Sequence, residues 1–185
     1  LQEGGWRPVD AEREVAGTFA GQPAKGYVDL VVEKDGAEAL VDLKLSGLKY
    51  RRGELEAGHG LQLALYASML AKRKGATLPP SGYFILSDGQ LLTLSPGAFP
   101  GATVVEGPSD RETLKGAEEG FRYWKKVLGG GVLPTRLEGL PVDEAVTGAA
   151  GPPPDAESLG HRDPPCRFCD FSATCVAPRV EEEQP

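Results

Sequence analysis

The sequence predicts an α/β (α+β) fold in which a mixed central sheet is flanked by helices. Three observations carry this prediction. The pair Asp35-Gly36, of the kind that closes β-hairpins, joins two apolar runs. Two later segments, 56–74 and 109–128, carry apolar residues suited to helices. The chain of 185 residues, 40% of them hydrophobic, is long enough for one domain with its own core.

The first three strands are expected at residues 12–19, 27–32 and 39–43. The turn 21–23 leads from the first strand to the second. The second and third strands each carry an acid where a core strand would have an apolar residue, and these acids are Asp29 and Asp42. The first strand carries Glu12 and Glu14, which we interpret as solvated acids on an edge strand.

Asp29, Asp42 and a nearby lysine indicate a metal site. Lys44 follows Asp42 by two residues, so both side chains emerge on the same face of a strand. The hairpin brings the two acids toward each other, and neighbouring carboxylates repel unless a cation lies between them. Hard carboxylate oxygens favour Mg2+ or Mn2+. The alternative is a set of edge-strand charges that face water.

A basic segment follows the third strand, and we expect it to be a loop from Ser46 onward. Its charged and aromatic residues could hold phosphates or stack on a base, or they could simply be solvated. The candidate DNA-binding residues in this segment are Lys49, Tyr50, Arg51 and Arg52.

The segment 56–74 is expected to be an apolar helix whose start is blurred by Gly58 and Gly60. Gln62 and Tyr66 are four residues apart and therefore share one helix face. A glutamine in so apolar a helix indicates that this face meets a polar site.

Two further strands are expected at 82–86 and 90–94, on either side of a turn at 87–89. Ser109 and Glu112 have the spacing of a capping box, which opens the last helix. Glycines 129–131 end that helix.

We divide the chain into a core at 1–131, a Pro- and Gly-rich connection at 132–164 and a tail at 165–185. The irregular tail carries all three cysteines of the chain in a Cys-x2-Cys-x5-Cys pattern: Cys166, Cys169 and Cys175. Such spacing is typical of a metal or cluster site, and it leaves zinc and iron–sulfur open. A secreted disulfide framework would need more cysteines, so we expect a cytoplasmic protein.

The net charge of −7 is unusual for a free-standing nucleic-acid binder, although a local basic surface would suffice. No apolar run is long enough for a membrane span, and we expect no membrane partner.

The motifs occur in a specific order: Gly26-x-x-Asp29, a hairpin, Asp42-Leu43-Lys44, and Gln62-x-x-x-Tyr66 on a helix. This ordered set resembles the PD-(D/E)XK nuclease superfamily, in its RecB-like or AddB-like branch. The resemblance covers residues 12–128 and 165–175. It implies a restriction-endonuclease-like fold and a metal-dependent DNA nuclease, expected to be an exonuclease within a larger DNA repair or recombination protein of the helicase–nuclease type. DNA and a helicase or another repair subunit or domain are the implied partners.

The resemblance also implies roles for individual residues. Asp29 and Asp42 would bind Mg2+ or Mn2+, with the carbonyl of Leu43 as a third ligand. Lys44 would orient the attacking water or neutralise developing charge. Gln62 would position substrate or water, and Tyr66 would lie beside the DNA.

Part of this branch carries a [4Fe–4S] cluster held by three C-terminal cysteines and one upstream, and the trio of this chain matches the C-terminal part. The chain lacks a fourth cysteine and a histidine before Asp29; His59 and His161 lie elsewhere. We expect the missing parts upstream of Leu1 in a longer parent protein. The competing interpretations are a catalytically degenerate nuclease-fold module that binds DNA or protein, and a zinc-ribbon tail.

Overall fold

The computed structural model describes residues 4–71 and 77–130. The chain divides into two compact units, Leu1–Glu118 and Glu119–Pro185. The first unit holds every described strand, two helices and the start of a third, and residues 119–130 of the second unit belong to or follow that third helix. Within the described part of the chain, no helix is long and apolar enough to cross a membrane.

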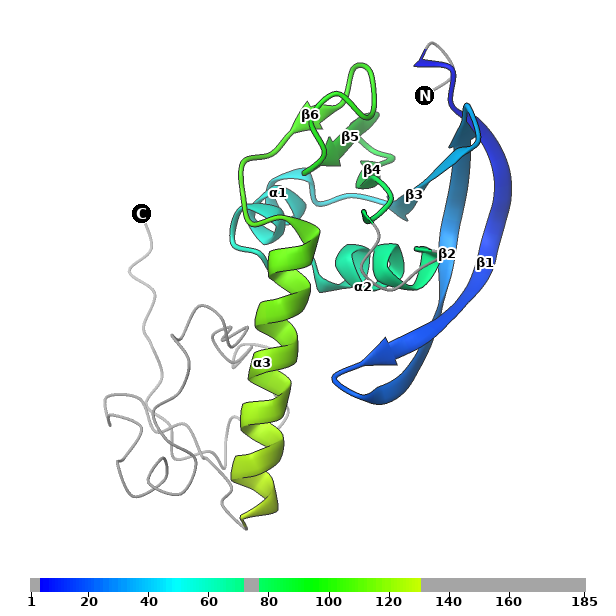
Figure 1. Ribbon diagram of the computed structural model, residues 1–185. Coiled ribbons are helices and arrows are strands. Elements are labelled where there is room, and N and C mark those ends of the chain that lie inside the picture. The colour runs from blue at the N-terminus through cyan, green and yellow to red at the C-terminus, as the bar shows by residue number, and fades with distance from the viewer. Residues whose placement is uncertain (1–3, 72–76, 131–185) are drawn as a thin grey trace, which may run out of the picture. The chain divides into compact units, whose positions relative to one another are not determined.

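The elements follow one another as β1 (Arg7–Phe19), β2 (Gln22–Lys34), β3 (Ala37–Lys44), α1 (Leu48–Glu56), α2 (Leu61–Leu70), β4 (Ser81–Ile85), β5 (Gln90–Thr93), β6 (Thr103–Val104) and α3 (Asp110–Gly129). The six strands form one sheet in the order β1-β2-β3-β4-β5-β6 (Figure 1). Strand β3 pairs parallel with β4, and β5 pairs parallel with β6, whereas the other pairs are antiparallel. The mixed sheet that the sequence predicts is confirmed.

Alternation along β3 sends its side chains into two different cores. Leu40 faces the first core, together with residues of β2, β4, β5 and the helices α1 and α2. Ala39 and Val41 face the second core, on the opposite face of the sheet, where they form one cluster with Trp6 and Phe99. Trp6 is fixed there by the hydrogen bond that its indole N–H donates to the carbonyl of Ala98, at 2.8 Å.

The hairpin turn between β2 and β3 forms as the sequence indicates. Asp35 and Gly36 both have positive φ, 51° and 79°, which the tight turns of two-residue hairpins require. The capping box also forms, because Ser109 N–H donates to Glu112 Oε2 at 2.8 Å. Next to it, the buried Asp110 accepts a hydrogen bond from Ser81 Oγ at 2.6 Å, which ties the start of α3 to β4.

The prediction of a loop after β3 is wrong, because residues 48–56 form helix α1. Gly47, with φ of 99°, reverses the chain before the helix begins. Leu48 and Leu55 lie seven residues apart and pack against the first core. This packing stabilises the helix, although the polar composition of the segment does not predict one.

Other boundaries differ from the expected ones. The predicted helix 56–74 is replaced by the end of α1 and by α2, separated at 57–60, where Gly58 has a φ of 66°. Strand β1 begins at Arg7 rather than at residue 12, and the short β6 was not predicted. Strand β6 pairs with β5 over two residues, which are too few to show the alternation of apolar and polar residues that predicts a strand.

At Gly26 of β2 the strand packs closely against Tyr66 of helix α2. A Cβ atom at Gly26 would lie 2.5 Å from Tyr66 Cε1 and 2.8 Å from the tyrosine oxygen. The absence of a side chain at position 26 therefore allows the ring of Tyr66 to lie against the strand. Two residues of the sequence motifs are thus packing partners.

We expect Gly26→Ala to destabilise the protein by about 1–3 kcal/mol, because the ring of Tyr66 would have to move. Chemical denaturation of the purified chain measures this free energy of unfolding. The matched control is Gly53→Ala in helix α1, where nothing lies within 4 Å of the added methyl group. That control should raise stability by up to about 1 kcal/mol. Equal effects of the two substitutions would contradict the packing role of Gly26.

Candidate active site

The site lies where β2 parts from β3. The ladder between these strands runs from the pair Lys34–Ala37 to the pair Leu30–Val41 and then stops, although β2 continues to pair with β1. Continued by one step, the register would place Asp29 opposite Asp42. The two acids of the sequence pattern therefore flank the point at which the sheet opens.

The carboxylate of Asp29 accepts the hydrogen bond that a backbone carbonyl of β2 would accept if the ladder continued. Leu43 donates its backbone N–H to Asp29 Oδ2 at 2.8 Å, so a side chain replaces the ladder bond that β2 no longer provides. The N–H and C=O of one strand residue point to the same side. The carbonyl of Leu43 therefore faces the side on which Asp29 lies.

Asp42 is a buried charge, with 1% of the residue exposed. Lys44 Nζ lies 2.7 Å from Asp42 Oδ2. The contact is an ion pair without good hydrogen-bond alignment, since both Asp42 oxygens lack a hydrogen-bond partner among the described residues. Burial raises the pKa of the Asp42 carboxyl, Lys44 opposes that rise, and the charge of Asp29 adds to it.

Lys44 joins the strand motif to the helix motif. Its ammonium group donates to Gln62 Oε1 at 3.1 Å while contacting Asp42. The same nitrogen lies 5.6 Å from the centre of the Tyr83 ring. Only 20% of the lysine side chain is exposed, so its position is set by these three neighbours.

The oxygen atoms at this point fit a hard divalent cation. Within the described part of the chain, the buried Asp42 oxygens accept no aligned hydrogen bond, and Asp29 and the Leu43 N–H lie beside them where the ladder ends. Within residues 4–71 and 77–130, no group of three or more His, Cys, Asp or Glu residues could hold a metal ion. The available set is thus two carboxylates and one carbonyl, which suits Mg2+ or Mn2+ with water in the remaining positions.

Helix α1 separates the four residues that the sequence grouped as a basic loop. Arg51 points inward, where it forms an ion pair with the buried Glu54 and lies against the Tyr83 ring. Lys49 and Tyr50 are exposed, and Arg52 is half-buried. Tyr66, grouped with them as a DNA contact, is half-buried against Gly26.

Sequence reasoning missed Glu54 and Tyr83. Tyr83 lies next to Asp42 in the parallel β3–β4 register, and it is 2% exposed. Burial is the main cause that raises the pKa of its phenol, followed by the negative charges of Glu54 and Asp42. No motif spacing connects β4 to β3, so only the strand pairing reveals this neighbour. Cys166, Cys169 and Cys175 lie outside the described residues.

We expect Asp42→Asn to stabilise the metal-free protein at neutral pH by roughly 0.5–2 kcal/mol. Because the folded state raises the pKa of Asp42, it binds the proton more tightly than the unfolded state does. Stability contributed by this residue therefore falls as pH rises from its ordinary pKa to its folded pKa. The advantage of the variant should vanish below the ordinary aspartate pKa.

Urea denaturation across this pH range, in the presence of a chelator, measures the effect. Asp35→Asn is the matched control, since Asp35 lies exposed in the hairpin turn. Its stability should follow that of the unmodified chain at each pH. A lower free energy of unfolding for Asp42→Asn than for the unmodified chain at neutral pH would show that the charge of Asp42 does not destabilise the fold.

Comparison with known proteins adds one match. A model of the PD-(D/E)XK nuclease superfamily matches residues 1–176. Comparisons with curated proteins and with solved structures gave no significant match. The match includes the whole sheet, on which Asp42 and Lys44 are paired and Gln62 reaches them from α2, and the sheet has the restriction-endonuclease-like arrangement. The chain therefore belongs to the PD-(D/E)XK nuclease superfamily.

Proposed function

We propose that the chain is a metal-dependent deoxyribonuclease domain that hydrolyses phosphodiester bonds. The observation that carries the proposal is the convergence of Asp42, Lys44 and Gln62 beside the opened ladder at Asp29. An acid, an ammonium group and an amide from two different elements meet inside the sheet, where the β2–β3 ladder ends. A buried ion pair adds little stability compared with hydrophobic residues of similar size, so chemistry at the site explains the buried carboxylate better than stability does.

Each residue has a role in this proposal. Asp29, Asp42 and the Leu43 carbonyl would hold Mg2+ or Mn2+, which supplies positive charge to the phosphate and lowers the pKa of an attacking water. Lys44 donates to the water or to a phosphate oxygen as negative charge develops. Gln62 keeps the ammonium group in place through a contact that does not depend on Asp42.

Two features support DNA as the substrate and a repair protein as the context. The order of the motifs resembles the RecB-like and AddB-like nucleases, and the cysteine trio at 166–175 has the spacing of their C-terminal cluster ligands. We infer an exonuclease that acts with a helicase or another repair subunit in a longer cytoplasmic protein. A [4Fe–4S] cluster would be completed by a fourth cysteine upstream, with Zn2+ as the alternative occupant.

A second candidate function is a catalytically degenerate module that binds DNA or a protein. The supporting observation is the limited ligand set, since the described residues offer two carboxylates at the site and no larger metal-binding group. The net charge of −7 also favours a protein partner over DNA. Cleavage that requires a divalent cation separates the two functions.

We expect Lys44→Ala to lower metal-dependent DNA cleavage by roughly 10²–10³-fold, as the loss of a charged group that acts on the transition state does. Gel-based cleavage assays of the chain and of a longer protein that contains it, with Mg2+ or Mn2+, measure this. Lys25→Ala is the control, because Lys25 of β2 forms an exposed ion pair with Glu14 of β1. Circular dichroism checks that each variant is folded. Undiminished cleavage by Lys44→Ala would remove the lysine from the mechanism.

The cysteine trio gives a separate prediction. Three thiolates in this chain should hold a [4Fe–4S] cluster poorly, because such clusters are normally bound by four. A longer protein with the fourth ligand, purified without oxygen, should be brown, and Cys169→Ala should remove the colour. Metal analysis that finds stoichiometric zinc and no iron would replace the cluster with a zinc site.

A further inference from the structure

Two arginines of the chain are buried to the same degree but differ in their partners. Arg13 of β1 and Arg51 of α1 each expose 26% of the side chain. Both carry a guanidinium group that contacts at least one carboxylate. The difference between them lies in the donors that remain unused.

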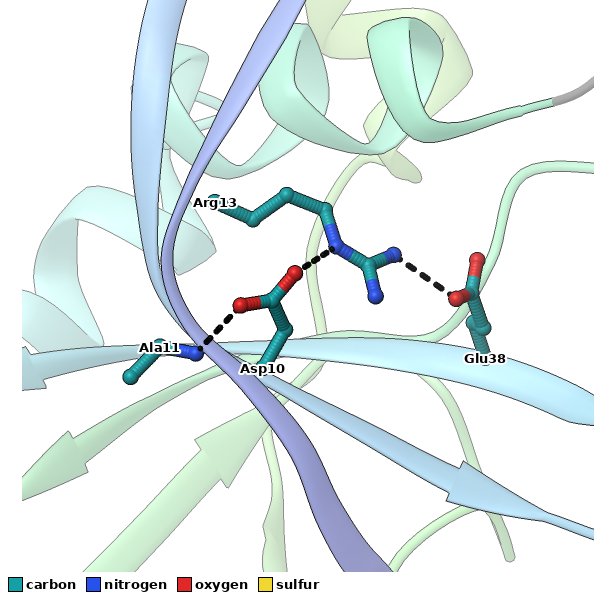
Figure 2. A network of polar contacts seen from close by, with 4 residues as sticks. All are labelled: Asp10, Ala11, Arg13 and Glu38. Atoms are coloured by element: carbon teal, nitrogen blue, oxygen red, sulfur yellow. Dashed lines mark hydrogen bonds and ion pairs between the residues drawn. The ribbon is translucent and has the colours of Figure 1, made fainter.

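The guanidinium of Arg13 is held on two sides (Figure 2). Its Nε donates to Asp10 Oδ2 at 2.7 Å, and Nη1 donates to Glu38 Oε1 at 2.7 Å. The other oxygen of Asp10 accepts the backbone N–H of Ala11 at 3.0 Å. Arg13 is therefore a structural arginine that ties β1 to the start of β3.

The guanidinium of Arg51 is fixed but not saturated. Nη1 forms the ion pair with Glu54, which is 9% exposed. Its Nε is buried and has no acceptor among the described residues. The rings of Tyr50 and Tyr83 lie 5.0 and 5.5 Å from the guanidinium carbon. A buried donor without an acceptor costs free energy, which a ligand oxygen would recover.

The position of Arg51 places this donor at the candidate site. The guanidinium carbon of Arg51 and the ammonium nitrogen of Lys44 lie 5.5 and 5.6 Å from the centre of the same Tyr83 ring. Burial raises the pKa of Asp42, and the positive charges of Lys44 and Arg51 both oppose that rise, so Arg51 lies within electrostatic reach of the carboxylate. Among the described residues, the Arg51 Nε donor and the Asp42 oxygens lack aligned hydrogen bonds, and both groups lie around Tyr83 in one site.

The charges of the site favour a single phosphodiester. Three carboxylates and two cations, Asp29, Asp42, Glu54, Lys44 and Arg51, sum to −1 when Asp42 is ionised. A bound divalent cation would change this sum to +1. One phosphodiester group carries one negative charge and would neutralise it.

We propose that Arg51 binds a non-bridging oxygen of the DNA phosphodiester at the site, through the Nε side of its guanidinium group. The proposal rests on the proposed nuclease function and adds a binding residue to it. Glu54 and the two tyrosine rings hold Arg51 in place before substrate arrives, so little side-chain entropy is lost on binding. The competing explanation is that Arg51 only secures helix α1 through Glu54.

The test measures binding of a short fluorescein-labelled DNA, as a single strand and as a duplex, by fluorescence anisotropy. The full chain is used, with Ca2+ as the divalent cation to limit cleavage during the titration. Kd is determined over a series of salt concentrations for the unmodified chain and for Arg51→Gln, Arg51→Lys, Glu54→Gln and Arg13→Gln. Thermal unfolding of each variant is recorded in the same buffer.

Arg51→Gln should raise Kd by roughly ten- to a hundredfold, the effect of losing a charge-assisted hydrogen bond. It should also reduce the slope of log Kd against log salt by about 0.7–0.9, the value of one phosphate contact. Arg51→Lys and Glu54→Gln should keep the slope, because both retain the positive charge. Arg13→Gln should change neither quantity, although it removes an equally buried arginine.

The double variant Arg51→Gln/Glu54→Gln addresses the competing explanation, since it removes both charges of the Arg51–Glu54 ion pair together. If it is stable and still loses one phosphate contact from the slope, the binding role stands. An unchanged slope in this variant, with DNA still bound, would overturn the role of Arg51 and leave the nuclease function intact. A chain that binds no DNA under any condition would overturn both.

Discussion

The site depends on a single interruption of the sheet, the end of the β2–β3 ladder after the pair Leu30–Val41. A strand inside a sheet cannot lose its partner without exposing backbone groups that need hydrogen bonds. Here the N–H of Leu43 is satisfied by the Asp29 carboxylate. The carboxylate that replaces this backbone partner also brings negative charge to the point where the ladder ends. The group that satisfies the backbone therefore also offers an oxygen ligand.

Asp42 shows how the fold keeps a charge inside the protein. Its strand neighbours Leu40 and Val41 are fully buried, and Lys44 forms an ion pair with the carboxylate. A hydrophobic residue at position 42 would suit the core better. The residue is therefore best explained by chemistry at the site, and the surrounding aromatic ring and helices keep water from screening its charge.

The sequence alone predicts those parts of the structure that depend on local chemistry. The Asp35-Gly36 turn, the Ser109 capping box and the same-face placement of Asp42 and Lys44 all follow from short-range rules. Helix α1 escapes prediction because its stability comes from Leu48 and Leu55 packing on a core built by distant strands. Tyr83 and the inward face of Arg51 escape for the same reason, since the pairing of β3 with β4 decides which side chains meet.

Strand β1 lies at one edge of the sheet, where a strand exposes backbone groups that could pair with another chain. Its register shifts between Pro8 and Asp10, and Glu12 has a positive φ of 51°, so the strand is bent rather than flat. Charged side chains also line it, including the network of Figure 2. A long and flat edge would be a template for aggregation. The bend and the charged side chains of β1 therefore disfavour pairing between the long β1–β2 hairpin and a strand of another chain.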